Sequence, residues 1–122
     1  MFSKVAFTMY PVKDPTRARA FYEETLGFER GPISSPDGMW TEYDLPGGGC
    51  LALFGGKEGP EPSAKMGACV AFEVEDLDTL VSQLEESGVT FYNEMVHSPV
   101  CRMAFILDSE GNPIILHELK KS

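Results

Sequence analysis

The sequence predicts an α+β fold made of two copies of one small β-α-β-β-β module, and three observations support this. A strand-like run leads into an aspartate and a helical stretch twice, with Asp14 and Asp76 lying 62 residues apart. Each helical stretch ends at a glycine, Gly27 or Gly88. Each half then closes with a glycine-containing turn before a last apolar run, at 50–54 or 114–119. Two open, curved sheets of this kind are expected to enclose a pocket between them.

The first module is expected to span residues 1–56. Residues 5–10 are rich in β-branched and aromatic side chains, which is typical of a strand, and Pro11 is expected to end its pairing. Asp14 is a good N-cap, and Pro15 suits the first helical position because its missing N–H has no partner there. Apolar residues then recur at helical spacing up to Gly27. Strands are expected at 28–30, 39–45 and 50–54, with a hairpin turn at 46–49.

The second module is expected to span residues 67–122, after a linker at 57–66 that is rich in Gly, Pro and charge. Asp76 caps the predicted helix, and strands are expected at 69–74, 89–95, 102–107 and 114–119. The linker is long enough to let the modules pair within one chain or swap between two chains. The whole chain is predicted to form one domain of two modules.

Composition narrows the classes of function. The 122 residues carry a formal net charge of −9, and the few Lys and Arg residues are scattered, so nucleic acid is a poor partner. No segment approaches the length of a membrane span, and the first residues do not resemble a secretory leader. Three cysteines without close pairing indicate neither a disulfide framework nor a zinc knuckle. Reduced thiols predict a cytoplasmic protein.

Several motifs, taken in order, resemble the vicinal oxygen chelate superfamily, which includes glyoxalase I, bleomycin-resistance proteins and extradiol dioxygenases. They are Val12-Lys13-Asp14, Ala20-Phe21-Tyr22, Leu26-Gly27-Phe28, Val74-Glu75-Asp76 and Asp108-x-Glu110-Gly111-Asn112. The resemblance implies paired modules whose sheets form an incomplete barrel around a cavity. It also implies a homodimer.

In metal-dependent members of that superfamily, four positions on the first and last strands of the modules hold a divalent ion through His or Glu. The matching positions here hold Phe7, Ala52, Cys69 and Ile115, and a shift of one residue on the last strands gives only Leu or Ile. One thiol without partners does not hold such an ion. The sequence therefore predicts no metal and no cofactor.

The residues that face the predicted pocket follow from strand alternation, because residues i and i+2 share a face. This face is mostly apolar, which suits a small hydrophobic or aromatic ligand, although the same side chains could simply fill a core. Three aromatic residues are added as rings that could stack on a planar ligand. The predicted pocket residues are Phe7, Met9, Tyr10, Trp40, Tyr43, Cys50, Ala52, Phe54, Cys69, Ala71 and Ile115.

Glu73 and His117 are the polar exceptions on that face. If their strands are neighbours, the carboxylate could orient the imidazole, raise its pKa and allow acid/base catalysis without a metal. The alternative is a structural or surface histidine. His97 is expected at a solvated strand end. Cys101 is expected to be structural, because no basic group other than Arg102, on the opposite face, adjoins it in the sequence.

These observations favour a metal-free protein, like the bleomycin-resistance type, that binds a small organic molecule in the inter-module cavity. The alternative is a lyase or isomerase that uses His117 and Glu73, or a metal at a non-standard site. A third alternative is a small interaction module. The sequence does not identify the ligand.

Overall fold

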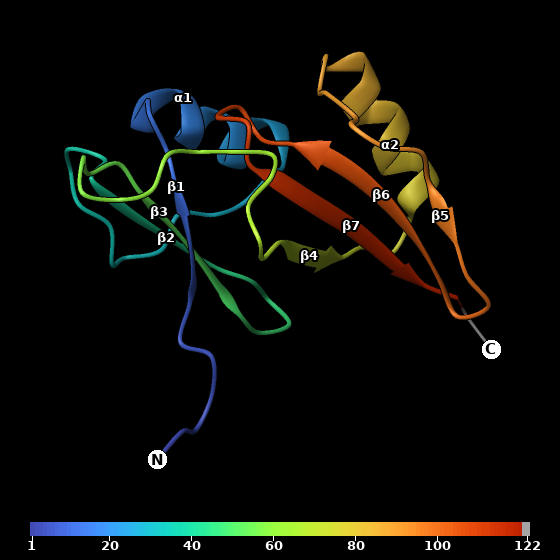
Figure 1. Cartoon of the computed structure of the whole chain (residues 1–122), viewed down its shortest axis with the longest axis horizontal. Coiled ribbons are helices and arrows are strands. Elements are labelled where there is room, and N and C mark those ends of the chain that lie inside the picture. Colours follow the sequence, from blue (N-terminus) through green and yellow to red (C-terminus); the bar gives the residue numbers. More distant parts are fainter. Residues whose placement is uncertain (121–122) are drawn as a thin grey trace. The chain divides into compact units, whose positions relative to one another are not determined.

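The computed structural model describes residues 1–120 and divides into two compact units, Met1–Pro62 and a second that begins at Ser63. The division falls inside the predicted linker 57–66. Figure 1 shows both units. Helices and strands are mixed in each unit, which confirms the predicted α+β class. No helix within residues 1–120 is long and apolar enough to cross a membrane.

The first unit is a three-stranded sheet with a helical segment. Its elements are β1 (Thr8–Pro11), α1 (Pro15–Ala20), the π-helical turn η1 (Phe21–Thr25), β2 (Trp40–Asp44) and β3 (Cys50–Phe54). The strand order is β1-β3-β2, with β1 parallel and β2 antiparallel to the central β3. The hairpin turn predicted at 46–49 connects β2 to β3, and Gly48 and Gly49 adopt there the positive φ that glycine tolerates best.

The helical segment begins where the sequence predicts. The Asp14 carboxylate accepts a hydrogen bond from the Arg17 N–H at 3.1 Å, and Pro15 occupies the first position. The last turn widens, because the Leu26 N–H donates to the Phe21 carbonyl at 3.0 Å. Gly27 then turns the chain with φ of +80°, which confirms the predicted stop.

Tyrosines dominate the buried core between this segment and the sheet. Tyr22 stacks on Tyr43 with ring centroids 5.8 Å apart, and both are fully buried. The Tyr43 hydroxyl donates to Glu23 at 2.9 Å. Tyr10 is also buried, at 2 % exposure. Tyr10 and Tyr43 therefore belong to the buried core, which corrects their inclusion among the predicted pocket residues as rings that could stack on a planar ligand.

The second unit is a four-stranded sheet covered by one helix. Its elements are β4 (Val70–Glu73), α2 (Leu77–Glu86), β5 (Val96–His97), β6 (Cys101–Leu107) and β7 (Pro113–Leu119). The strand order is β4-β7-β6-β5; β4 is parallel to β7, and the other pairs are antiparallel. This is the predicted β-α-β-β-β module. Helix α2 contacts β7, and its residues Leu77 and Leu84 are buried, as are Ile106 and Ile114 of the sheet.

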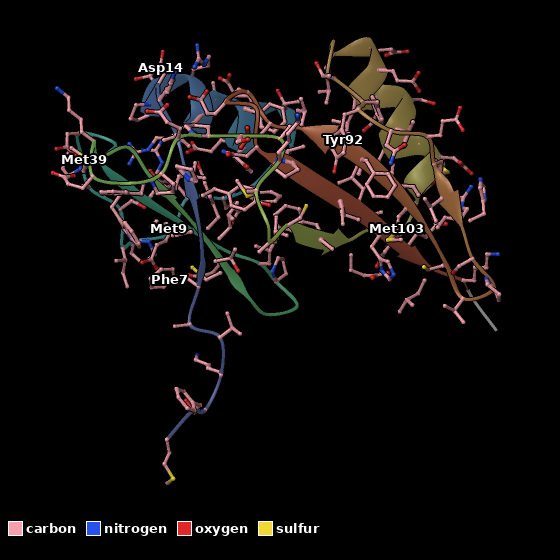
Figure 2. All side chains as sticks on the ribbon, viewed as in Figure 1. Phe7, Met9, Asp14, Met39, Tyr92 and Met103 are labelled. Atoms are coloured by element: carbon pink, nitrogen blue, oxygen red, sulfur yellow. The ribbon has the colours of Figure 1, made fainter. Side chains whose placement is uncertain are left out.

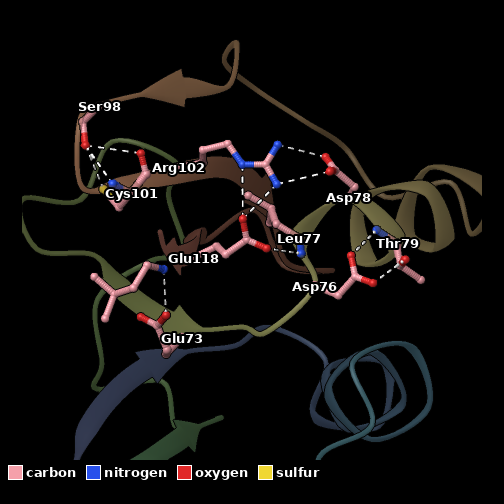
Figure 3. A network of polar contacts seen from close by, with 10 residues as sticks. Glu73, Asp76, Leu77, Asp78, Thr79, Ser98, Cys101, Arg102 and Glu118 are labelled. Carbon is pink, nitrogen blue, oxygen red and sulfur yellow. Dashed lines mark hydrogen bonds and ion pairs between the residues drawn. The ribbon is translucent and has the colours of Figure 1, made fainter. Parts of the chain in front are cut away.

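Polar contacts fix the start of α2 (Figure 3). Asp76 caps the helix by accepting from the Thr79 N–H at 3.1 Å and from its hydroxyl at 2.8 Å. The Arg102 guanidinium of β6 donates hydrogen bonds to the carboxylates of Asp78 in α2 and Glu118 in β7. Glu118 in turn accepts from the Leu77 N–H at 2.9 Å. Arg102 thus connects the helix to two strands on the helix-covered face.

The acidic turn before β7 is a closed hydrogen-bond unit. Asp108 accepts from the backbone N–H groups of Glu110 and Asn112, both at 2.8 Å. It also accepts from the Asn112 side-chain amide at 3.0 Å. Gly111 adopts a φ of +90° between them. The motif therefore positions the start of β7 through its side chains.

Three predicted strands differ from the structure. Residues 28–30 form no strand, because the Phe28 N–H continues the helix end by donating to Tyr22. Residues 89–95 contribute only a bridge from Phe91 to Ile106, and the strand β5 follows them. The strand predicted to begin at residue 5 starts at Thr8. Pro11 does not end the pairing, since β1 is an edge strand and the Val12 N–H still donates to the Phe54 carbonyl at 2.9 Å.

Candidate functional site

Each sheet has one face under its helix and one face left open by its own unit. On the three-stranded sheet the register aligns Met9 with Ala52 and Glu42 across all three strands. On the four-stranded sheet it aligns Glu73 with His117 and Met103. Side chains in such a row share a face. Figure 2 labels Met9 of β1, Phe7 just before it and Met103 of β6.

The open face of the first unit is aromatic. The Trp40 ring meets Phe7 edge-on, with centroids 5.3 Å apart, and lies 6.2 Å from the Phe54 ring. Phe7 and Met9 remain 44 % and 37 % exposed. Ala52 lies in the same row but is fully buried under its neighbours. The structure thus brings most of the predicted residues of this unit onto one apolar face.

Glu42 is the polar centre of this face. The Trp40 indole N–H donates to one carboxylate oxygen at 2.7 Å, and the Cys50 thiol donates to the other at 3.7 Å. Burial, with Glu42 and Asp44 nearby, raises the pKa of the Cys50 thiol to about 11. Cys50 is therefore a protonated, unreactive thiol at neutral pH. Sequence reasoning missed Glu42, although its alternation with Trp40 in a predicted strand was a usable signal.

The open face of the second unit carries the predicted polar pair. His117 Nδ1 lies 2.6 Å from a Glu73 carboxylate oxygen, and the other oxygen accepts from the Leu119 N–H at 3.0 Å. The pKa of His117 is raised, chiefly by the Glu73 hydrogen bond. The pKa of Glu73 is lowered by that same bond and by the Leu119 N–H. β4 and β7 are neighbours, so the pair is formed as the sequence predicted.

This pair predicts a pH-dependent stability. Because the pKa of His117 is raised in the folded chain, protonated His117 stabilises the fold. This stabilisation is fully present below the unfolded-state pKa of 6.5 and is lost as the pH rises through the folded-state pKa. Because the pKa of Glu73 is lowered, ionised Glu73 also stabilises the fold. This stabilisation is fully present above the unfolded-state pKa of 4.5 and is lost as the pH falls through the folded-state pKa. Glu73→Gln is therefore expected to destabilise the chain more at pH 5.5 than at pH 8.5, as measured by urea unfolding. An equal loss at both pH values would contradict the coupling.

Sequence reasoning assigned Cys101 no basic neighbour on its own face. Cys101 pairs with Leu119 and Met103 pairs with His117, so Cys101 and His117 are diagonal neighbours on the open face. Ser98 Oγ lies 3.3 Å from the Cys101 sulfur. The pKa of Cys101 is lowered, first by Ser98 and then by His117 and Lys120. The antiparallel pairing of β6 with β7 creates this contact, and the linear sequence does not show it.

The remaining predicted residues belong to the second unit. Cys69 is exposed and its thiol donates to the Pro113 carbonyl at 3.3 Å. Ala71 and Ile115 are register partners in the row beside Glu73 and His117. His97 in β5 is exposed, as expected. These residues add apolar surface and no further charge.

The residues at the family's metal positions offer almost no ligand atoms. Phe7, Ala52 and Ile115 offer no lone pair, and the Cys69 thiol is engaged with a backbone carbonyl. Within residues 1–120, no three His, Cys, Asp or Glu side chains gather so as to hold an ion. Glu73 and Cys101 both interact with one imidazole instead of converging on a common point. The residues present do not fit the family's metal.

Comparison with known proteins defines the class. A model of the Glyoxalase/Bleomycin resistance protein/Dioxygenase superfamily matches residues 4–116. The chain therefore belongs to this superfamily, as the motifs indicated. The crystal structure of TnmS3, an antibiotic binding protein from Streptomyces sp. CB03234, is 27 % identical with a TM-score of 0.75 and 98 % coverage of each chain.

Two further matches support the same family. A superfamily member from Sphaerobacter thermophilus DSM 20745 is 26 % identical, with a TM-score of 0.75, over 96 % of this chain and 98 % of that one. The anthracycline biosynthesis protein DauV of Streptomyces sp. (strain C5) is 32 % identical over 108 residues. That match covers 86 % of this chain but only 38 % of DauV, so the chain spans well under half the length of this relative.

Proposed function

We propose that the chain binds a small, planar organic molecule on its open sheet faces and does so without a metal. The main support for this proposal is that other residues replace the family's metal ligands. Where metal-dependent members present His or Glu, this chain presents Phe7, Ala52, Cys69 and Ile115. Replacing ligands with apolar side chains favours dispersion and stacking over Lewis-acid chemistry.

The ligand class is supported by the relatives and by the aromatic face. TnmS3 is described as an antibiotic binding protein and DauV as an anthracycline biosynthesis protein. Trp40, Phe7 and Phe54 form the kind of surface on which a fused aromatic ring system stacks. A net charge of −9 would also attract a ligand that carries an amine. We therefore infer an anthracycline-like aromatic antibiotic as the ligand class.

Titration with doxorubicin, an anthracycline, tests this proposal. Trp40 is the only tryptophan, so its fluorescence should be quenched as the complex forms, and calorimetry gives the affinity. Trp40→Ala is expected to weaken binding roughly tenfold, about 1.4 kcal/mol, because a stacking ring is lost. Phe2→Ala is the matched control, since this ring is fully exposed. Absence of heat and quenching at millimolar ligand, or equal losses in both variants, would contradict the proposal.

A second candidate function is favoured by the 2.6 Å Glu73–His117 contact, which could serve metal-independent acid/base chemistry in a lyase or isomerase. Substitution of His117 separates the two functions. A folded His117→Ala variant that loses turnover on a candidate substrate but keeps doxorubicin affinity would favour the enzyme. Unchanged turnover would remove His117 from any mechanism.

We also propose a homodimer in a reducing compartment such as the cytoplasm. The exposed apolar side chains of Phe7, Met9 and Val96 and the edge strands of both sheets support association. Within residues 1–120 the three cysteines form no disulfide, which suits a reducing environment. Light scattering should give a mass near twice 13.4 kDa, and a monomer at micromolar concentration would contradict the dimer.

A further inference from the structure

Three groups on the open face of the four-stranded sheet form a thiol–imidazole–carboxylate series. Cys101 lies at the start of β6, His117 in the adjacent β7 and Glu73 in β4, on the other side of β7. The register places all three on the same face. The series therefore depends on neighbouring strands of one sheet, which hold it in a fixed order.

The protons of this series follow from its hydrogen bonds. The Glu73 carboxylate accepts a hydrogen bond from His117 Nδ1. In the neutral ring Nδ1 therefore carries the proton, and Nε2 is left as a proton acceptor. Cys101 and His117 are diagonal neighbours on the open face, and the nearby His117 side chain is one of the groups that lower the pKa of the Cys101 thiol. Proton transfer from sulfur to His117 would place an imidazolium between a thiolate and a carboxylate.

The surroundings of the sulfur favour the thiolate. The Ser98 hydroxyl lies 3.3 Å from Sγ and also accepts from the Cys101 N–H at 3.0 Å, which holds it in place (Figure 3). Lys120, just after β7, adds a positive charge that favours the thiolate. The carboxylate in the series, Glu73, bonds to His117 and to the Leu119 N–H. Such surroundings are those of reactive cysteines.

We propose that Cys101 is a nucleophile that His117 activates and Glu73 positions, and that it forms thioethers with small electrophiles such as α,β-unsaturated carbonyl compounds. The inference goes beyond noncovalent binding and does not depend on it. Cys101 is 8 % exposed, so only small electrophiles should reach the sulfur. Cys50 forms no such series, because its thiol faces carboxylates alone.

The step is balanced without an oxidant or reductant. The thiol proton moves to His117 Nε2, and the sulfur lone pair forms an S–C bond to the β-carbon. The C=C π pair shifts to give an enolate, which takes the proton back from the imidazolium. The net reaction adds the thiol across the double bond. Glu73 touches no reacting atom and acts only by orienting and charging His117.

Alkylation with N-ethylmaleimide, measured by peptide mass spectrometry in the wild-type chain, tests this directly. Cys50 in the same sample is the internal control, because its raised pKa leaves little thiolate. At pH 6.5 Cys101 is expected to react at least about tenfold faster than Cys50, since each pKa unit changes the thiolate fraction tenfold. An unmodified Cys101 in the folded chain that becomes modified after denaturation would overturn the proposal.

Two variants show whether His117 activates the Cys101 thiol or whether Cys101 reacts only because it is accessible. His117→Gln is expected to slow Cys101 alkylation at pH 6.5 about tenfold while leaving Cys50 unchanged. Glu73→Gln should move the midpoint of the Cys101 pH–rate profile to higher pH, because the imidazolium loses its carboxylate partner. Unfolding midpoints of both variants would show that they are folded. Identical pH–rate profiles in wild type and His117→Gln would also overturn the proposal.

Discussion

Tyr22→Ala is expected to lower the free energy of unfolding by about 3–5 kcal/mol, because it removes a buried aromatic ring from a closely packed core. Tyr22 is fully buried and contacts Phe21, Phe28 and Tyr43, with ring centroids 5.3 to 5.8 Å apart. These contacts join the helical segment to β2 and to the chain after Gly27. Urea unfolding followed by circular dichroism measures the loss.

Tyr92→Ala is the matched control, since it makes the same chemical change at a ring that is 40 % exposed and contacts the Phe105 ring. It should cost about 1 kcal/mol. If both variants lose the same free energy of unfolding, the tyrosine cluster does not form the core of the first unit.

Asn112→Ala is expected to cost about 2–4 kcal/mol, because it leaves buried polar groups without their partners. The Asn112 side chain is fully buried; its amide N–H donates to Asp108 at 3.0 Å, and its oxygen accepts from the Ser63 N–H at 3.3 Å. The variant would weaken the turn that starts β7, the central partner of β4 and β6. The loss is measured by urea unfolding.

Ser109→Ala in the same turn is the control, because its hydroxyl bonds to Glu110, next to it in the chain. Its effect should stay within about 0.5 kcal/mol of wild type. An Asn112→Ala variant as stable as Ser109→Ala would show that the acidic turn is held by its backbone alone.

The fold was predictable where local chemistry determines the structure. Asp14 and Asp76 cap helices and Gly27 and Gly88 end them, and each of these effects acts within a few residues. The limits of β3, Cys50–Phe54, followed from one apolar run. The segment at 28–30 was mispredicted because the widened helix end uses the Phe28 N–H, which a sequence pattern does not show.

The candidate site was predictable only in part. Strand alternation correctly placed Glu73 and His117 on one face, because that requires only a period of two. It could not place Cys101 beside His117, since this contact depends on the register between β6 and β7. Tyr10 and Tyr43 were selected for their ring chemistry, but both are buried, and Tyr43 stacks on Tyr22 of the helical segment.

We propose that this member of the superfamily binds its ligand with apolar and aromatic side chains at the positions that hold an ion in metal-dependent members. The most direct test is calorimetric titration of doxorubicin into metal-stripped protein, repeated with EDTA and with added Ni²⁺, Zn²⁺, Mn²⁺, Fe²⁺ or Co²⁺. We predict one dissociation constant in every condition and no stoichiometric metal in the untreated protein. Binding that requires one of these ions, or tight uptake of the ion itself, would contradict the claim.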